Sequence, residues 1–179
     1  MRKNNKTLYL AVNALVAAVY AALTMSLGFM SYAGIQFRVA EALCVLPFFF
    51  PRTVWGLFIG CCIANLLSPA GPLDIIFGSL ATLGCCLSVA ALGRSKKYAS
   101  WMRCIAACAM PILFNGVIVG AVLAFTIAEP GQSFGAAFAL FGAQVAFGEI
   151  VVMAALGLPL IRLLPKTALF KWLNERLGY

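Results

Sequence analysis

The stretch that decides the fold is residues 36–47, Gln-Phe-Arg-Val-Ala-Glu-Ala-Leu-Cys-Val-Leu-Pro. It places two charges, Arg38 and Glu41, three residues apart in a strongly apolar sequence. On a helix this spacing puts both side chains on neighbouring positions of one face. An ionisable group at the centre of a membrane helix costs about 3 kcal/mol, so it faces the protein interior, pairs, or meets a polar ligand. Two interpretations stay open here: an ion pair near the outer membrane interface, and a ligand site.

The composition predicts a membrane protein. Of 179 residues, 64% are hydrophobic and only 10% are charged, and no soluble domain of this size needs so much apolar surface. We therefore expect an all-α, polytopic membrane protein in which residues 1–179 form a single integral-membrane domain.

Polar breaks divide the chain into six apolar segments, which predict six transmembrane helices. The expected spans are residues 8–30, 36–50, 54–67, 73–93, 104–128 and 134–164. The first span is longer than the apolar core of a signal peptide, so we expect it to be retained. Pro159 is expected to kink or end the last span. Residues 169–177 form a basic amphipathic tail suited to the membrane surface.

The positive charges predict the orientation. Six spans place both termini on one side, and that side collects twelve of the thirteen Lys and Arg residues, all except Arg38. The positive-inside rule then puts both termini in the cytoplasm of a cell with this protein in its plasma membrane. This distribution also accounts for the formal charge of +8 without any nucleic acid partner.

Several polar residues are predicted to converge between the spans. Counting 1.5 Å per residue from the outer ends places Asn115, Gln144 and Glu149 about 20, 15 and 22 Å deep, so these three can meet near the middle of the membrane. Arg38, Glu41 and Asp74 belong near the outer ends of their helices, and Asn65 lies in the third span. Together they outline a polar pocket that opens to the outside.

The charges in this outline do not balance. Arg38 supplies one positive charge, and Glu41, Asp74 and Glu149 supply three negative ones, a formal charge of −2. Such a buried excess is relieved by protonation or by a cationic, donor-rich ligand. Asp74 has an alternative role as the cap of the fourth helix. Glu149 has two: a proton relay, or a neutral group hydrogen-bonded within the bundle.

The chain has seven cysteines and no histidine. Because Cys61-Cys62 and Cys85-Cys86 are adjacent pairs in apolar runs, we expect buried, reduced thiols rather than a metal site. No hydrolase motif and no Gly-x-x-x-x-Gly-Lys phosphate-binding loop is present, so we predict neither an enzyme nor an ATP-binding chain. If the chain drives uptake against a gradient, the energy must come from a partner or an ion.

The first span carries a stripe of small residues, the kind of surface that lets another helix approach closely. At 100° per residue, the following alanines fall on one face: Ala11, Ala14, Ala18 and Ala22. The partner of this stripe is either another helix of the same chain or a separate subunit.

Three blocks of sequence, residues 35–43, 56–66 and 74–83, resemble the QueT family, the substrate-binding S-components of energy-coupling factor (ECF) transporters for queuosine precursors. The resemblance implies a six-helix bundle that captures a 7-deazaguanine from outside the cell. It also implies an ECF module of one transmembrane coupling protein and two ATPases, which hydrolyse the ATP, so that this chain needs no cofactor. S-components dock through small residues on their first helix, which matches the alanine stripe.

The predicted pocket suits such a ligand. A guanine-type edge offers two adjacent donors, which one carboxylate accepts, and a carbonyl, to which Gln144, Asn115 or Arg38 can donate. Tyr32 and Phe37 are expected to stack on the ring. The carried precursor stays open among the aminomethyl base, its nitrile relative and queuine. Two other functions stay open: a proton-coupled secondary carrier working through Glu149, and a membrane scaffold.

Overall fold

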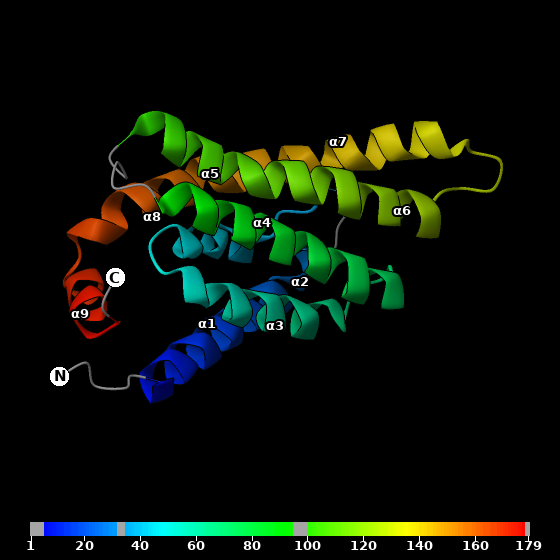
Figure 1. Cartoon of the computed structure of the whole chain (residues 1–179). Helices are drawn as coiled ribbons and strands as arrows, with labels where there is room; N and C mark the ends of the chain where they lie inside the picture. Colours follow the sequence, from blue (N-terminus) through cyan, green and yellow to red (C-terminus); the bar gives the residue numbers. More distant parts are fainter. Residues whose placement is uncertain (1–5, 32–34, 95–99, 178–179) are drawn as a thin grey trace.

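The computed structural model of the chain describes residues 6–31, 35–94 and 100–177, and all regular structure within them is helical. The elements are α1 (Lys6–Ser26), α2 (Gly28–Ser31), η1 (Val39–Phe48), η2 (Pro51–Thr53), α3 (Val54–Asn65), η3 (Asp74–Gly78), α4 (Ser79–Gly93), α5 (Trp101–Phe114), η4 (Asn115–Val119), α6 (Gly120–Thr126), α7 (Phe134–Val152), η5 (Met153–Gly157), α8 (Leu158–Leu163), η6 (Leu164–Lys166) and α9 (Ala168–Leu177). The helices α3, α4, α5–α6 and α7–α8 run side by side, and α9 turns across one end of the bundle (Figure 1).

The centre of the bundle is η1, which contacts α1, α4, α5, α7 and α8. It is a 3₁₀-helix of ten residues, and seven of them are buried. Because a 3₁₀-helix has three residues per turn, side chains three apart lie directly above one another. Glu41 and Cys44 therefore share one face of η1, and both are fully buried.

Four helical runs are long and apolar enough to cross a membrane: Lys6–Ser26, Asp74–Gly93, Trp101–Thr126 and Phe134–Lys166. The predicted second and third spans are shorter. Ten 3₁₀ residues in η1 and twelve α-helical residues in α3 each reach about 20 Å, against about 30 Å for the membrane core. The structure thus shows a multi-pass helical bundle, and it does not confirm the predicted count of six spans.

Each of three long runs contains one π-helical segment: η3, η4 and η5. The segment η5 ends two residues before Pro159, which lies in the first turn of α8. Proline lacks the backbone N–H that an α-helix needs, and a local π-turn absorbs that loss. The helical run therefore continues through Pro159 to Lys166, so it does not end there.

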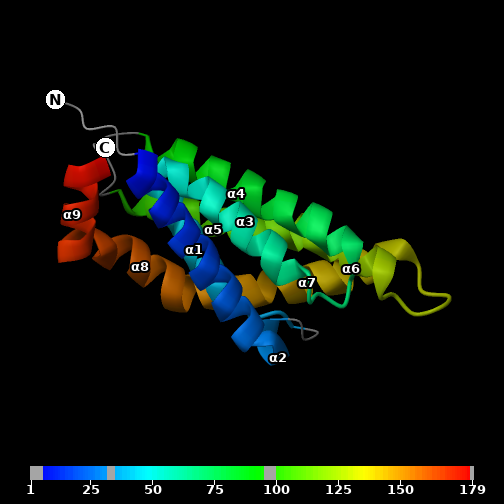
Figure 2. The same ribbon diagram turned by 90° about the horizontal axis from the view of Figure 1, so that it is seen from below.

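The first helix packs most closely on α3, which it crosses at an angle (Figure 2). Two glycines of α3 allow this approach. A Cβ added at Gly56 would lie 2.6 Å from the Asn13 carbonyl oxygen, and one at Gly60 would lie 2.8 Å from that of Ala17. The Asn13 side chain also accepts a hydrogen bond of 2.7 Å from the Gly56 N–H. Small residues thus bring the two backbones into contact.

Basic side chains join elements at the end of the bundle where α1 starts and α9 lies. The guanidinium of Arg52 lies 4.2 Å from the Tyr9 ring centroid, and that of Arg162 lies 4.5 Å from the Trp101 ring. Phe170 of α9 packs against Phe49 and Phe50. Lys and Arg at positions 2, 3, 96 and 97 lie outside the described residues.

Six of the seven cysteines are buried and Cys62 is half-buried, as expected for thiols that pack in the core. The Sγ atoms of Cys44, Cys85 and Cys86 lie within 4.8 Å of one another, between η1 and α4.

Candidate functional site

Arg38 and Asp74 form a buried ion pair that joins the start of η1 to the start of η3. Arg38 Nη2 lies 3.2 Å from Asp74 Oδ2, and both side chains are almost fully buried. Asp74 is the first residue of η3, and no side-chain capping bond was found at that end. The ion pair therefore replaces the capping role that the sequence allowed. The ion pair that the structure shows for Arg38 is with Asp74, whereas one of the two interpretations of the sequence paired it with Glu41.

Glu41 is held by two donors within the protein. The Tyr20 hydroxyl of α1 donates to Oε1, and the Cys44 thiol donates to Oε2 at 3.1 Å. The Cys44 contact follows from the 3₁₀ geometry, because residues three apart are stacked. Both carboxylate oxygens thus have partners.

Asn115 and Glu149 meet inside the bundle, as their depths predicted. Asn115 Nδ2 donates to Glu149 Oε1 at 2.8 Å, and the side chains are 3% and 2% exposed. Among the described residues, Glu149 Oε2 has no hydrogen-bond partner. The helix α7, which carries Glu149, packs against η1, and η4, which carries Asn115, packs against η3.

Asn65 connects the end of α3 to η3. Its Nδ2 atom donates to the Asp74 carbonyl at 3.0 Å and to the Cys61 sulfur at 3.4 Å. Its Oδ1 atom accepts nothing from the part of the chain that the structure describes. Gly78 leaves room for this arrangement, since a Cβ there would overlap Asp74 Oδ1 and lie 3.0 Å from Asn65 Nδ2.

The structure gives less detail on the remaining predicted site residues. Gln144 is half-buried, and its Oε1 atom is buried with no partner within the described ranges. Phe37 is half-buried and packs edge-on against Phe147, with ring centroids 6.5 Å apart. Its backbone neighbour Gln36 lies against Gly148, where a Cβ would overlap the Gln36 carbonyl oxygen. Tyr32 lies outside the described residues.

Several of the buried side-chain atoms without a partner are of one chemical kind. In residues 6–31, 35–94 and 100–177, the buried carboxylate and amide atoms that lack a partner include four acceptor oxygens: Asn65 Oδ1, Asp74 Oδ1, Gln144 Oε1 and Glu149 Oε2. Buried acceptors of this kind are costly unless they receive hydrogen bonds. With Arg38 against three carboxyl groups, the formal charge is also −2. A ligand that meets them must therefore supply N–H donors, and a positive charge suits it.

The three π-helical segments lie next to this cluster. Asp74 begins η3 and Asn115 begins η4, while the Glu149 carbonyl accepts the backbone N–H of Met153 at the start of η5. The segment η3 packs against η4, and η4 packs against α7. Isolated π-turns occur most often at functional sites, where they rotate side chains out of the regular register. Two of the residues with unpaired acceptors, Asp74 and Glu149, thus adjoin π-helical segments.

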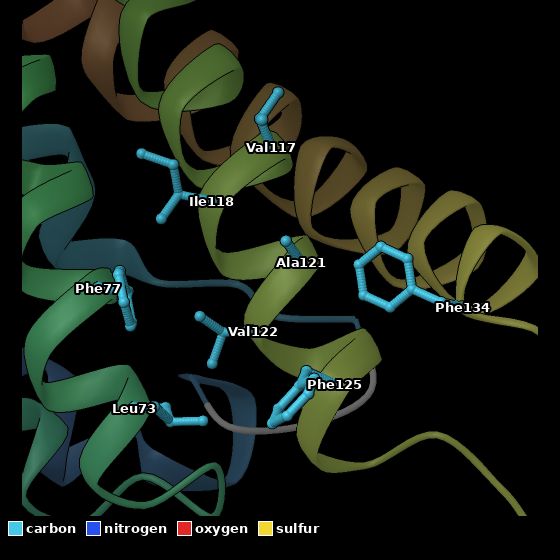
Figure 3. A pocket seen from close by; sticks show the side chains of 8 residues that line it. All are labelled: Leu73, Phe77, Val117, Ile118, Ala121, Val122, Phe125 and Phe134. Atoms are coloured by element: carbon cyan, nitrogen blue, oxygen red, sulfur yellow. The ribbon is translucent and has the colours of Figure 1, made fainter.

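A cavity of about 470 Å³ lies on the flank of the bundle, and its lining is apolar. Figure 3 shows Leu73 and Phe77 on one side and Val122 and Phe125 on the other. Phe125 and Phe134 are more than half exposed, so this hollow opens at the surface of the bundle. It offers no hydrogen-bond partner to a polar ligand, and it is not the candidate site.

Sequence reasoning missed Tyr20, Cys44 and Ser79. Tyr20 is fully buried in an apolar helix, and a buried tyrosine hydroxyl needs a partner, so its sequence context gave a usable signal. Ser79 is buried with its hydroxyl unpaired among the described residues, one turn beyond Asp74. A lone serine in a helix gives no such signal.

Buried polar groups inside a multi-pass helical bundle mark a substrate or ion pathway, which favours the class of membrane transport proteins. The sequence profile of the QueT transporter family matches residues 10–166, and the chain belongs to this family. It is therefore a transporter and not an enzyme.

One curated relative gives more detail. The queuosine precursor transporter QueT of Lactococcus lactis subsp. cremoris (strain MG1363) is 43% identical over 83 residues. These residues cover 45% of this chain and 48% of that protein, so the match spans about half of the relative's length. No solved structure matches the chain significantly.

Proposed function

We propose that this protein is the substrate-capture subunit, or S-component, of an ECF importer, and that it binds a queuosine precursor from outside the cell. Membership of the QueT transporter family supports the transport role. The name of the Lactococcus relative supports a queuosine precursor as the solute. The precursors share a 7-deazaguanine ring, whose guanine edge carries two adjacent N–H donors.

The observation that carries the proposal is the set of unpaired acceptors, above all Glu149 Oε2. Asn115 holds the other oxygen of Glu149, which orients the carboxylate. The free oxygen can then accept from the guanine edge in a charge-assisted hydrogen bond. Gln144 lies within two turns of Glu149 on α7 and adds either a donor or an acceptor for the ring.

Delivery requires a partner in this proposal. Ala11, Ala14, Ala18 and Ala22 are all exposed on α1, as a docking stripe for a coupling protein requires. The partner module then comprises that coupling protein and two ATPases, which hydrolyse ATP for this chain. We place the protein in the bacterial plasma membrane as six spans with both termini in the cytoplasm, on the strength of the charge distribution.

The proposal is tested at Glu149. A Glu149→Gln variant keeps an oxygen for Asn115 but puts an NH₂ group where the ligand needs an acceptor. Truncating one side of a buried charged pair costs about 2–5 kcal/mol. We therefore expect the variant to fold and to bind a 7-deazaguanine at least about 30-fold more weakly, as measured by calorimetry on the detergent-solubilised protein.

The matched control is Glu129→Gln, which makes the same change at an exposed residue between α6 and α7. It should leave the affinity unchanged. Near-native affinity of Glu149→Gln would remove Glu149 from the site. Failure of the unaltered protein to bind any 7-deazaguanine would overturn the proposed function itself.

A further inference from the structure

We propose that the site selects the precursor that bears a primary ammonium group, and that Asp74 Oδ1 and Asn65 Oδ1 receive this group. The inference rests on the proposed function, because it assumes that a 7-deazaguanine binds here. It goes further by choosing between an aminomethyl substituent and a nitrile on the same ring.

The two substituents make opposite demands on the protein. An ammonium group carries three N–H donors and one positive charge, whereas a nitrile carries no donor and presents an acceptor nitrogen. Asp74 Oδ1 and Asn65 Oδ1 are buried acceptors without partners in the described part of the chain. A nitrile placed against them would leave both unpaired, while an ammonium group satisfies both.

The surrounding structure keeps these two oxygens available. Arg38 occupies Oδ2 of Asp74, which leaves Oδ1 on the other side of the carboxylate. The amide nitrogen of Asn65 is committed to the Asp74 carbonyl, so this side chain presents its oxygen. Both side chains adjoin Gly78, where the missing Cβ gives Asp74 Oδ1 its space. A cation is therefore offered two acceptor oxygens.

The charge of the whole cluster favours a cation even though Arg38 is present. Arg38 offsets only one of the carboxyl groups of Glu41, Asp74 and Glu149, so the formal charge is −2 before a ligand binds. Glu149 and Asn115 lie on the neighbouring elements α7 and η4, and η4 packs against η3. The ring edge and the aminomethyl group, at opposite ends of one ligand, can thus meet Glu149 and Asp74 respectively.

The experiment compares three ligands on the purified full-length protein in detergent: 7-aminomethyl-, 7-cyano- and 7-methyl-7-deazaguanine. The methyl compound controls for the ring and for the size of the substituent. Hydrogen bonds to a charged group predict that calorimetry gives an affinity for the amine roughly 10- to 100-fold above that for either neutral ligand. Equal affinities for all three would overturn the inference while leaving the proposed function intact, whereas no binding by any of them would overturn the proposed function.

Asp74→Asn tests the assignment of the residue. It should weaken binding of the amine by about tenfold or more and change binding of the methyl compound by less than about threefold. An equal loss for both ligands would show that Asp74 supports the fold through Arg38, and it would contradict the assigned role. The comparison of ligands on the unaltered protein stands whether or not this variant folds.

Discussion

Two buried glutamates, Glu41 and Glu149, differ in how their oxygens are used. Glu41 receives hydrogen bonds on both oxygens from Tyr20 and Cys44, so it serves to join α1 and η1. Glu149 receives one bond from Asn115 and keeps one oxygen unpaired within the described residues. A carboxylate that the protein has fully satisfied is a structural group, and one with a free oxygen is a candidate for a ligand.

The structural role of Glu41 can be tested at Cys44. Cys44→Ala removes the donor to Glu41 Oε2 and leaves a buried acceptor unpaired, which costs about 1–3 kcal/mol. Cys44→Ser keeps a donor at the same position and should be the more stable of the two. Thermal unfolding in detergent measures the difference. If the alanine and serine variants unfold at the same temperature, the hydrogen bond from the Cys44 thiol to Glu41 does not stabilise the protein.

The sequence predicts part of this site for a clear physical reason. Asn115 and Glu149 lie in long helical runs, where a constant rise per residue fixes depth, and their contact was expected. The partner of Arg38 was not predicted, because Arg38 is the non-helical residue before η1 and its partner Asp74 lies on a different element, η3. The bond from Tyr20 depends on how α1 crosses the bundle, which spacing along one helix does not determine.

At the scale of elements, the contact between α1 and α3 positions Tyr20 over η1. The backbones touch at Gly56 and Gly60, and the Cβ of Tyr20 would lie 2.9 Å from a Cβ added at Gly60. Both glycines lie in the predicted third span, but the sequence does not show which helix they face. Their spacing of four residues is typical of close helix packing in membranes.

Gly60→Ala should therefore destabilise the protein by about 1–3 kcal/mol, because α1 must move to admit the methyl group. The control is Gly135→Ala in the first turn of α7, where an added Cβ meets nothing within 4 Å. Alanine is the better helix former, so this control should be neutral or stabilising by up to about 1 kcal/mol. Thermal unfolding measures the stability of both variants. A Gly60→Ala protein as stable as the control would contradict the close packing of α1 on α3.

At the scale of the whole molecule, α1 has two faces with different neighbours. Tyr20 and Ala21 are buried against the bundle, whereas Ala14, Ala18 and Ala22 are exposed. An exposed stripe of alanines in a membrane gains nothing from lipid, and it permits close contact with a helix of another protein. The predicted role of this stripe in docking stays a prediction, and its exposure is consistent with it.

Ala18→Leu should block assembly with the coupling protein while the isolated chain binds its ligand within about threefold of the native affinity. The added side chain projects from the exposed face, so the fold has room for it. Ala155→Leu makes the same change at an exposed position of η5 and should leave assembly intact. Co-purification with the module and calorimetry give the two readouts. Loss of ligand binding by Ala18→Leu would show that the stripe serves the chain's own packing.

The hydrogen bond from Tyr20 to Glu41 also has a mechanical consequence. Ala18 and Tyr20 are two residues apart on one rigid helix, so a torque applied by a partner at the exposed face passes directly to η1. In η1, Glu41 is three residues from Arg38, which forms an ion pair with Asp74 on η3. We therefore expect the bundle to tilt in the membrane as one body when a partner acts on the exposed face of α1.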